Sequence, residues 1–562
     1  MFSFQPLHCI YDPSIVIIAC AFLVVGFILR TQAIHARLTL LISYAIEVIL
    51  CHRYQIKHVE NRADLPSLPY IFPNGQGNVD KFLQGREKSA KWESEYGSLY
   101  RLWAGMKGEV VLTKATHVEA VFRDSHKHTK ARANDSGYLM DRLLGSCLGL
   151  ISGSSWNVVK AGVEAPFLHR STSTYITDVQ SFAKEYMRSL VAENRTSKEH
   201  RRLHPVRDLK LLPFLFVARV VYGSFGADLE RELRALIPLR EELFKSVVAG
   251  GITRFPVARF LPLPAMRALR DFKKRWAAWS DRAHHASVLK AGGAEERESA
   301  PIIGMYRSVE EGNMTREQLL QTLDEMLFAN IDVTMGGLSW ALVFLAAHPA
   351  VQNALRSEIQ SHPTTGKMRD AYLLSSWTTT PTLLGACILE SARLRPLAAF
   401  SVPQSCPTPR VLDGFEVPAG TSFVIDSYAL NIRDPFWGDD RERFRPQRWL
   451  ERQKRGHDNL RYRYWRFGFG PRTCLGKYVA ELLLRTVVVE IVENWSISLE
   501  EAKGTVGQTG KEIVGDKDGY NKKEVEEGED TNMDWPWDDE MWIHHPDLFL
   551  RYRPLGTAAD CL

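Results

Sequence analysis

The sequence predicts a mainly α-helical protein with small β-sheets, preceded by an N-terminal membrane helix. An uncharged apolar run comes first, at residues 14–29. Patterns with the period of an α-helix dominate the rest of the chain, as at 213–226, 316–330 and 348–359. Strand-like signals are short and few, as at 108–113 and 420–430. These three observations together predict the fold class.

The composition excludes several classes of protein. Of 562 residues, 45% are hydrophobic and 24% are charged, which is ordinary for a globular protein, and the length alone allows two to four domains. The net charge of +5 is small, and no zinc-finger, helix-turn-helix or RNA-binding signature occurs, so no nucleic-acid partner is expected. The eight cysteines are scattered without a CxxC pair, which argues against a disulfide framework and a Cys-rich zinc site.

The first apolar run predicts a retained membrane anchor at residues 1–37. Its sixteen residues would span about 24 Å as a helix, slightly less than the roughly 30 Å hydrocarbon core of a bilayer. A cleaved signal peptide is the alternative. However, no Lys or Arg precedes the run and no clear cleavage site follows it. Cations follow it instead, beginning with Arg30 and Arg37, which predicts that the rest of the chain stays cytoplasmic.

Residues 38–65 connect this anchor to a body that we place at 66–562. The apolar run 38–51 is interrupted by Glu47. It predicts either a second, shallow membrane helix or a helix that lies on the membrane or packs on the body. Three prolines within 65–73 then predict a stiff extended linker. Late in the body, residues 501–532 are rich in Lys, Glu, Gly and Asp, which predicts a solvated, flexible loop.

One cysteine stands out from the other seven. In FGFGPRTCLGKYVAELLLR (467–485), glycines surround Cys474 and a helical run starts directly after it. A Gly-rich turn at a helix N-terminus directs several backbone N–H groups at one sulfur, and these donors favour the thiolate. Such a thiolate suits a single soft metal centre. The alternative for a cysteine alone is a buried structural residue on a turn.

The string FGFGPRTCLG resembles the haem-binding loop of the cytochrome P450 family, the haem-thiolate monooxygenases. The resemblance implies that Cys474 is the axial ligand of the iron of haem b. It further implies that Phe467 covers the sulfur side of the haem and that Arg472 pairs with a haem propionate. A thiolate ligand pushes electron density onto the iron and favours O–O cleavage.

Further motifs follow in the order of this family. Glu390 and Arg393, in LESARLRP (389–396), share a helix face, and FRPQRWL (444–450) supplies Arg448. In the family, these three form a buried charge network behind the haem. Without that context, a Glu-x-x-Arg pair is usually a solvated surface pair. The resemblance runs from about residue 66 to 555, so it implies one large helical domain.

Two further regions are compared with the family residue by residue. Trp156 and Lys160 match its early Trp-x-x-x-basic helix and would contact a propionate, although a Trp and a Lys four residues apart are more often ordinary packing. The family also places a propionate-binding Arg some ten to twelve residues after the Glu of Glu-x-x-Arg, where this chain has Phe400, Ser401 and Val402. The same stretch implies a substrate-facing surface at Ala398, Ala399 and Phe400, which equally fits core packing.

The string ANIDVT (329–334) resembles the family's central helix, where an acid followed directly by Thr delivers protons during O–O cleavage. The acid is Asp332, but Val333 occupies the Thr position and Thr334 comes one residue late. On a regular helix Asp332 and Thr334 lie roughly 200° apart. Two accounts are possible. In the first, a helix bulge turns Thr334 back toward the pocket. In the second, which we favour, Thr334 is structural and bonds to a carbonyl one turn back, and Asp332 and water move the protons.

Residues 441–466 hold ten Lys and Arg side chains against three acids and lead directly into the Cys474 loop. Such a charge run is usually a solvated face. Close to the thiolate side of a haem, it would steer an acidic electron donor. For membrane-anchored members of the family, this donor is an NADPH-cytochrome P450 reductase, sometimes with cytochrome b5. We expect some of these cations, Arg448 among them, to point inward.

The sequence therefore predicts a monooxygenase that uses haem, O2 and NADPH-derived electrons to oxidise a small hydrophobic molecule. Its N-terminal helix is expected to lie in the lipid of the endoplasmic reticulum membrane. It is most similar to fungal secondary-metabolism members. Segments from LAAFSVPQ to ALNIRDPFWG resemble enzymes of diketopiperazine mycotoxin pathways such as that of gliotoxin. Two alternatives stay open. One is a haem-thiolate enzyme for oxidative coupling, isomerisation or peroxygenation, and the other is a non-catalytic membrane haem-binding protein.

Overall fold

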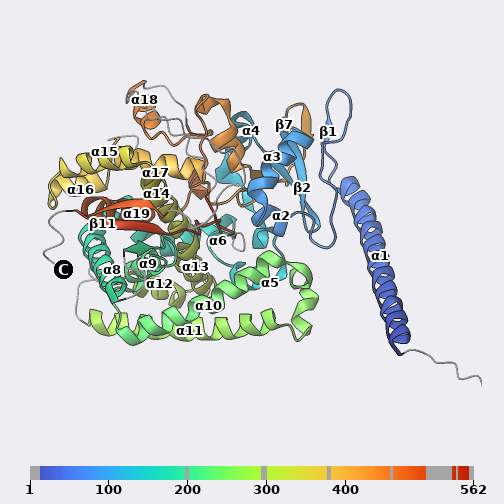
Figure 1. Cartoon of the computed structure of the whole chain (residues 1–562), viewed down its shortest axis with the longest axis horizontal. Helices are drawn as coiled ribbons and strands as arrows, with labels where there is room; N and C mark the ends of the chain where they lie inside the picture. The colour runs from blue at the N-terminus through green and yellow to red at the C-terminus, as the bar shows by residue number, and fades with distance from the viewer. Residues whose placement is uncertain are drawn as a thin grey trace, which may run out of the picture.

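A long N-terminal helix and a large helical body make up the structure, a computed structural model (Figure 1). It describes residues 13–196, 201–292, 300–375, 381–455, 460–500, 535–538 and 542–555. The first twelve residues of the expected anchor, the side chains of 14–29 and the expected loop 501–532 lie outside the described residues. The expected fold class, mainly helical with small sheets, is confirmed.

The helices follow the expected hydrophobic patterns. The runs 213–226, 316–330 and 348–359 correspond to α9, α13 and α15. The helices are α1 (Pro13–Arg53), α2 (Val79–Phe82), α3 (Gly85–Tyr96), α4 (Ala115–Phe122), α5 (Tyr138–Leu144), α6 (Gly153–Val163), α7 (His169–Thr172), α8 (Ile176–Thr196), α9 (Leu211–Tyr222), α10 (Ala227–Ala249), α11 (Pro264–Ala291), α12 (Pro301–Glu310), α13 (Arg316–Ala329), α14 (Met335–Ala347), α15 (Pro349–Gln360), α16 (Lys367–Leu373), α17 (Leu383–Leu394), α18 (Gln447–Arg455) and α19 (Lys477–Asn494).

Three small sheets hold the described strands. The largest has the order β2-β3-β9-β6-β4, and the others are β1-β8-β7 and β10-β11-β5. β2 and β3 pair antiparallel across a two-residue turn, whereas β3 and β9 pair parallel. The strands are β1 (Lys57–His58), β2 (Leu99–Ala104), β3 (Lys107–Leu112), β4 (Thr129–Lys130), β5 (Arg202–Leu203), β6 (Gln404–Ser405), β7 (Arg410–Leu412), β8 (Phe415–Val417), β9 (Ser422–Ile425), β10 (Trp495–Leu499) and β11 (Leu550–Pro554).

The main hydrophobic core surrounds α13 and α14, which run through the middle of the body (Figure 1). A capping box formed by Thr315 and Gln318 starts α13. The two helices are joined by a π-helical turn, Asn330–Thr334. Residues 316–347 are apolar and long enough to span a membrane, yet 72% of their most apolar window is buried inside the protein. This segment is therefore the core helix of the body.

Helix α1 is continuous from Pro13 to Arg53, so the run 38–51 forms no separate second helix. Within it, Ile34–Arg53 has the length and composition of a membrane span, and only 11% of its most apolar window is buried. The last turns of α1 contact the body through Leu50, which packs with Tyr70 and Trp103. Glu47 also accepts a hydrogen bond from the backbone N–H of Tyr70. The break in the apolar run thus marks where α1 meets the body.

Candidate active site

The loop before α19 forms a tight cradle around Cys474. Gly468 and Gly470 adopt φ angles of +83° and +67°, which other residues rarely reach. A Cβ on Gly470 would also lie 2.3 Å from Oγ of Ser125. The N–H of Cys474 donates to the carbonyl of Phe467 at 2.8 Å, which closes the loop. The glycines therefore have the role expected from the sequence.

Cys474 is deep in the molecule and yet open on one side. Burial raises the pKa of its thiol, while the backbone N–H groups of Gly476 and Lys477 lower it as expected. Despite this depth, the side chain of Cys474 is exposed to solvent. A sulfur with both properties lies on the wall of an internal cleft. The arrangement fits a haem against the sulfur, because the cofactor would cover the open side.

Trp156 lies between the two cations expected to bind a propionate. The guanidinium of Arg472 stands 4.4 Å from the centre of the Trp156 ring, and Nζ of Lys160 stands 5.3 Å from it. Arg472 also donates to the carbonyl of Ile151 at 2.8 Å. Lys160 is already paired with Glu164 at 3.1 Å. The structure thus brings the three residues together but leaves Arg472 as the better candidate for an anionic ligand.

A third cation near this site, Lys130 in β4, was not predicted. Burial and the neighbouring Arg472 charge lower the pKa of Lys130 to about 8, although Glu325 opposes this shift. Burial also lowers the pKa of Arg472, to about 10. Among the described residues, none accepts a hydrogen bond from Nζ of Lys130. Two buried cations that repel each other fit a dianionic ligand such as the two haem propionates. A single Lys in a strand gives no signal of this in the sequence.

Phe400 replaces the family's propionate-binding Arg and serves the core instead. Its ring is 4% exposed and packs 5.7 Å from Trp92, within the cluster beneath the five-stranded sheet. The structure therefore favours core packing for Phe400 over the expected substrate-facing role. Ala398 and Ala399 are half-buried, and Ala399 packs against that cluster. Of the three residues, Ala398 retains the expected exposure.

Glu390, Arg393 and Arg448 form one buried network. Arg393 donates to both carboxylate oxygens of Glu390 at 2.9 Å, and Nε of Arg448 donates to Oε1 at 2.8 Å. Trp449 adds an indole N–H donor at 2.8 Å. The side chains of Glu390 and Arg393 are 0% exposed and that of Arg448 is 3% exposed. This geometry excludes the alternative of a solvated surface pair.

The central helix presents one partly open stripe to the cleft. The half-exposed residues between 325 and 337 are Glu325, Met326, Ala329, Asn330, Asp332, Val333 and Gly337. Four of them, Met326, Ala329, Val333 and Gly337, recur at intervals of three and four residues. These intervals place the four residues on one face of the helix. Val333, at the position of the family's Thr, therefore lies on the open face.

The π-helical turn at Asn330–Thr334 changes the account of Thr334. The turn is wider than that of a regular helix, so the local bulge that one of the two expected accounts required is present. The expected backbone acceptor is wrong. The hydroxyl of Thr334 donates to Oδ1 of the Asn330 side chain at 2.7 Å, and the Asn330 amide in turn donates to the carbonyl of Met326. Thr334 is 8% exposed. Asn330 thus replaces the family's Gly with a side chain that occupies the hydroxyl.

Asp332 is held by residues from the far end of the chain. Its Oδ2 accepts a hydrogen bond from the indole N–H of Trp542 at 3.3 Å, and its backbone oxygen lies 2.8 Å from Nε2 of His545. Burial raises the pKa of the Asp332 carboxyl, an effect that His545 and the Trp542 hydrogen bond oppose. A carboxyl with a raised pKa keeps its proton to a higher pH than a free Asp side chain does, which suits a group that passes protons on.

Glu325 is a further half-buried acid on the central helix, and it was not predicted. Its Oε2 accepts a hydrogen bond from the N–H of Gly149 at 3.0 Å. Burial raises the pKa of this carboxyl, while the Gly149 N–H and Lys130 lower it. Its charge is also felt at Cys474, where it raises the thiol pKa. Glu325 therefore borders the same cleft.

Some of the cations in the stretch 441–466 are engaged in ion pairs, some buried and some at the surface. Four of them pair with acids: Arg445 with Asp440 and Glu451, Arg448 with Glu390 and Asp440, Arg463 with Asp434, and Arg466 with Glu481. Arg448 points inward as expected. The exposed ones are Arg443, Lys454, Arg455 and Arg461. The expected basic surface is therefore smaller than the charge count implies.

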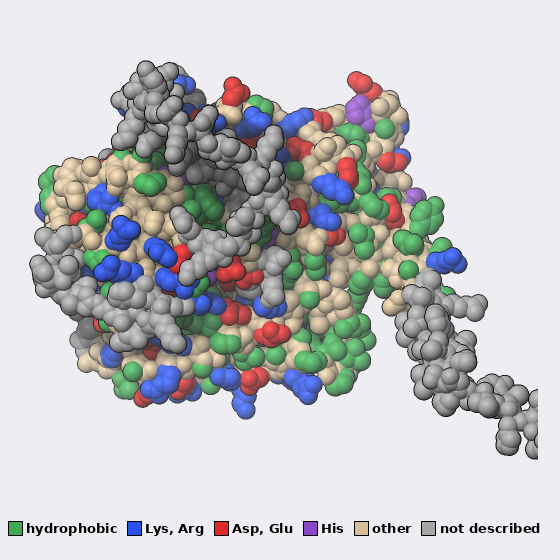
Figure 2. All heavy atoms as spheres, in the orientation of Figure 1, with side chains coloured by type: hydrophobic (Ala, Val, Ile, Leu, Met, Phe, Trp, Pro, Cys, Tyr) green, Lys and Arg blue, Asp and Glu red, His purple; other side chains and the backbone are tan. Residues whose placement is uncertain are grey.

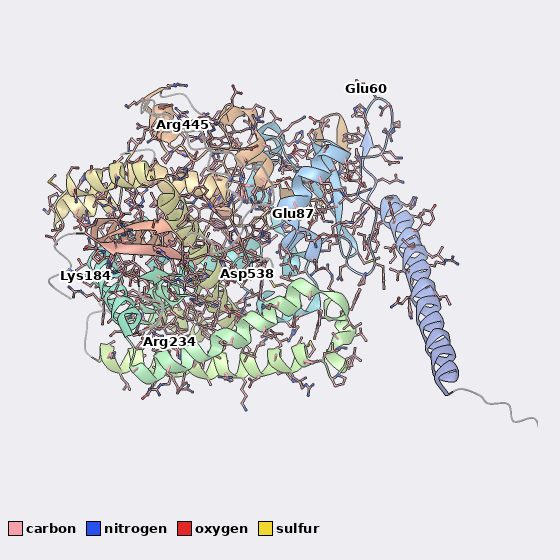
Figure 3. The ribbon with its side chains drawn as sticks, in the orientation of Figure 1. Glu60, Glu87, Lys184, Arg234, Arg445 and Asp538 are labelled. Carbon is pink, nitrogen blue, oxygen red and sulfur yellow. The ribbon has the colours of Figure 1, made fainter. Side chains whose placement is uncertain are left out.

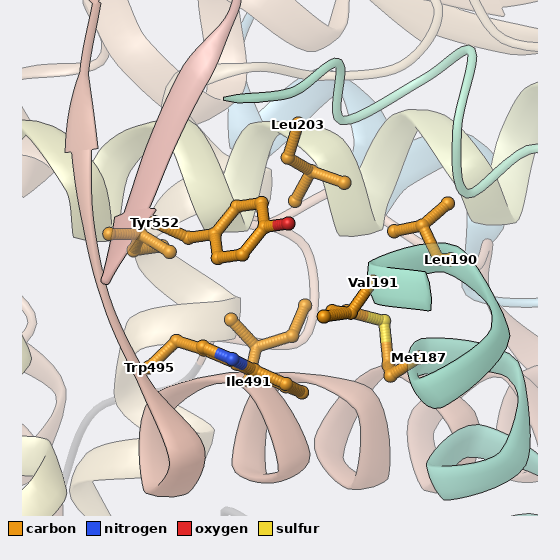
Figure 4. A pocket seen from close by; sticks show the side chains of 8 residues that line it. Met187, Leu190, Val191, Leu203, Ile491, Trp495 and Tyr552 are labelled. Carbon is orange, nitrogen blue, oxygen red and sulfur yellow. The ribbon is translucent and has the colours of Figure 1, made fainter. Parts of the chain in front are cut away.

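A separate small pocket lies away from this site. It is enclosed by Met187, Val191, Ile491, Trp495 and Tyr552 between α8, α19 and the sheet of β10 and β11 (Figure 4). Ile491 is fourteen residues along α19 from Lys477, about 20 Å along the helix axis. With a volume of about 10 Å³, the pocket is too small for a substrate.

Comparisons with known proteins agree on one family. Residues 67–516 match the family described as Cytochrome P450. The chain is 45% identical over 499 residues to cytochrome P450 monooxygenase aclC of Aspergillus oryzae, covering 89% of this chain and 94% of that protein. It is 37% identical over 467 residues to cytochrome P450 monooxygenase gliC of Aspergillus fumigatus, covering 82% and 88%. A solved zebrafish cytochrome P450 structure with progesterone aligns with a TM-score of 0.60 at 18% identity, covering 83% and 98%.

Proposed function

The chain belongs to the cytochrome P450 family, and from this premise we propose that Cys474 binds the haem iron and that the cleft above it oxidises a hydrophobic cyclic dipeptide. As a member of this family, the protein is a haem-thiolate monooxygenase that uses O2 and receives NADPH-derived electrons from a redox partner. The observation that carries the assignment is the Cys474 sulfur, deep in the fold and exposed to the cleft.

The residues around the cleft divide the work of holding the cofactor. Cys474 supplies the axial thiolate, and the N–H groups of Gly476 and Lys477 stabilise its charge. Arg472, packed on Trp156, and Lys130 would neutralise the propionates. Phe467 flanks the sulfur through the closed loop. When bound, the haem supplies oxygen activation, which no protein side chain can supply alone.

On the opposite side of the cleft, Asp332 handles protons. Its buried carboxyl holds a proton at Oδ1 or Oδ2 and releases it toward the half-exposed stripe at Ala329 and Val333. Thr334 cannot donate its proton to the cleft while its hydroxyl is bonded to Asn330. The apolar stripe excludes bulk water from the substrate, which strengthens the electrostatic effect of Asp332.

The substrate assignment rests on the relatives and on the cleft. The curated relatives aclC and gliC are monooxygenases of filamentous fungi. The half-exposed residues Met326, Ala329, Val333 and Gly337 of the central helix carry no polar side chain, and the half-exposed Glu325, Asn330 and Asp332 lie beside them. Such a surface suits a compact hydrophobic molecule with a few polar atoms, as in the diketopiperazines of fungal secondary metabolism. We place the enzyme in the biosynthesis of such a metabolite, of the mycotoxin type.

The setting of the enzyme follows from its surface. The exposed apolar side chains of α1 between Ile34 and Ile49 support an anchor in the endoplasmic reticulum membrane, with the body in the cytoplasm. Hydrophobic side chains also gather on the side of the body that faces α1 (Figure 2), where Ile252, Val257, Phe260 and Leu261 are exposed. Membrane lipid would cover these surfaces.

The reduced, carbon-monoxide-bound spectrum of the full chain tests the haem assignment. A haem-thiolate gives a strongly red-shifted absorption band, and Cys474→His should abolish this band while haem still binds. A variant that kept the band would overturn the role of Cys474. Titration with cyclo(L-Phe-L-Phe) should displace water from the haem and shift its spectrum, with lauric acid as a comparison. Stronger binding of lauric acid would contradict the substrate class.

The exposed cations beside the Cys474 loop would dock the NADPH-cytochrome P450 reductase and cytochrome b5. Charge reversal at Lys454 and Arg455 together should slow electron transfer from the reductase several-fold at low salt, with a smaller difference as salt rises. Arg234→Glu is the control, since Arg234 lies on the side of the body opposite Arg445 (Figure 3). A loss of affinity for the cyclic dipeptide instead would contradict docking at this surface.

A further inference from the structure

The chain returns to its own active site shortly before it ends. Residues Trp542, Ile543, His544 and His545, which we name the C-terminal strap, lie against the π-helical turn of the central helix. Their two contacts with Asp332 join residues 210 and 213 positions apart in the sequence. Asp332 is therefore held in place by a segment that no motif of the sequence predicts.

The strap is anchored on both sides of these contacts. Ile543 is 1% exposed, and the indole N–H of Trp340 donates to the carbonyl of His544 at 2.9 Å. The strap can lie this close because residue 336 is Gly. A Cβ there would come within 2.9 Å of Ile543 and 3.2 Å of His545. The Trp542 ring packs 5.5 Å from Phe244 of α10.

A short hairpin-like arrangement supports the strap from behind. The N–H of Asp538 donates to the carbonyl of His545, and the N–H of Asp547 donates to that of Pro536, both at 2.9 Å. Trp535 packs edge-on against Phe344 of α14. Figure 3 shows Asp538 over the middle of the body, which is where the central helix runs. The strap is thus a fixed part of the body, not a loose tail.

The chemistry of the two contacts defines their direction. The backbone oxygen of Asp332 can only accept, so Nε2 of His545 carries the hydrogen and donates. The backbone of the widened turn is thereby tied to the strap. The indole N–H of Trp542 can only donate, so it fixes the carboxylate oxygen Oδ2. One contact holds the backbone of the acid and the other holds its side chain.

We propose that Trp542 and His545 are positioning residues that hold Asp332 in the orientation from which it passes protons to the cleft. This inference rests on the proposed role of Asp332. The strap replaces the geometric constraint that the family's Thr, absent at Val333, would add next to the acid. The other charged groups that act on Asp332 are Glu241 of α10 and Lys210 before α9, which pair with each other. Glu241 raises the pKa of Asp332 and Lys210 lowers it.

The test uses the full-length holoenzyme with its reductase and cyclo(L-Phe-L-Phe) as the probe. Trp542→Phe keeps an aromatic ring but removes the N–H. We expect about a three- to ten-fold lower yield of product per NADPH, with more H2O2 released, because a misplaced acid directs its proton less often to the position that leads to product. The ionisation that limits kcat should move to higher pH, since the lost hydrogen bond favoured the carboxylate. The carbon monoxide spectrum and the affinity for the probe should not change.

Three further variants separate positioning from packing. Trp279→Phe removes an indole hydrogen bond of similar length, 2.8 Å to the carbonyl of Leu229, from a buried Trp that does not touch the strap. It should leave the yield per NADPH unchanged. His545→Leu should lower that yield, and His545→Gln should restore it, because a Gln side chain can donate to the same carbonyl. If His545→Leu fails to fold, Trp542→Phe still decides.

Asp332→Asn distinguishes failure of this inference from failure of the proposed function. If Asp332→Asn loses coupling while Trp542→Phe keeps the wild-type yield and pH profile, the strap only packs and the inference is overturned. If Asp332→Asn keeps the wild-type yield, the proposed role of Asp332 fails first. If only Trp542→Phe lowers the yield, the strap acts by another route and the inference is equally overturned.

Discussion

The side of the cleft that holds Cys474 and the side that holds Asp332 are built in different ways. Around Cys474, the contacts that hold the sulfur are close in sequence, although Arg472 reaches Trp156 and Ile151 from far along the chain. The sulfur is held by a loop of ten residues and the first turn of α19, and Arg393 is one turn from Glu390. Around Asp332, the partners come from 210 residues or more along the chain. Glu325 is likewise bonded to Gly149, 176 residues away.

The difference follows from what each side must do. A thiolate ligand needs a fixed number of N–H donors and a tight turn, and a short Gly-rich string specifies both. A proton-handling acid needs a degree of burial and a direction, and any neighbouring element can provide these. The first kind of site therefore has a sequence pattern, whereas the second is assembled by tertiary packing.

The largest expected effect tests whether the motif-rich side depends on its buried charges. Glu390→Gln leaves Arg393 and Arg448 buried without their shared carboxylate. Breaking a buried ion pair from one side costs about 3–5 kcal/mol, so we expect a loss of this size in the free energy of unfolding, measured by urea denaturation of the holoenzyme. Haem content after purification should fall in parallel.

Glu451→Gln is the matched control for this prediction. It removes the same type of group from a pair with Arg445 whose side chains are 41% and 44% exposed. A solvent-exposed pair contributes about 0–1 kcal/mol, so this variant should unfold almost as the wild type does. Equal losses of unfolding free energy in the two variants would mean that burial does not determine how much the ion pairs of Glu390 stabilise the protein.

The next effect concerns Lys130, which lies where the two sides meet. Without haem its pKa is lowered to about 8, and propionates would raise it because they favour the charged form. Below pH 8, Lys130 is charged in both the haem-free and the haem-bound protein. Above that pH, haem binding must take up a proton, so haem affinity should fall as the pH rises above about 8. The rate of haem transfer to apomyoglobin measures this.

Lys130→Met should remove that pH dependence and weaken haem binding about ten-fold at neutral pH, since a hydrogen bond to a charged group contributes about 1.5–3 kcal/mol. Lys160→Met is the control. Lys160 is already paired with Glu164, so its loss should matter less. A larger effect of Lys160→Met would restore the assignment that the sequence pattern favours.

The sequence predicted the elements and motifs that depend on local pattern. It placed α9, α13, α15 and β3 correctly, and it identified Glu390, Arg393 and Arg448, which the structure joins in one buried network. It also predicted that Arg448 points inward. These features were accessible because hydrophobic period, glycine position and the spacing of charges are written along the chain.

The sequence could not predict contacts that arise only when distant segments meet. A bulge in the central helix was only one of two accounts, because the widened turn depends on Asn330 and on the strap across Asp332. Lys130 and Glu325 carry no pattern of their own. Phe400 was assigned to the substrate surface because its position along the motif is known, but the sheet beneath it decides where its ring packs.

The smallest expected effect concerns Thr334, which is close to Asp332 in sequence but takes no part in proton transfer in our proposal. In the π-helical turn it donates to Asn330, and Val333 occupies the open face of the helix. Thr334→Val should therefore cost about 1 kcal/mol of stability, the usual contribution of one buried hydrogen bond, and change the product formed per NADPH less than about two-fold. Thermal unfolding and the coupling assay measure the two quantities. A collapse in coupling would mean that the hydroxyl leaves Asn330 during turnover, and the two sides of the cleft would then share one proton relay after all.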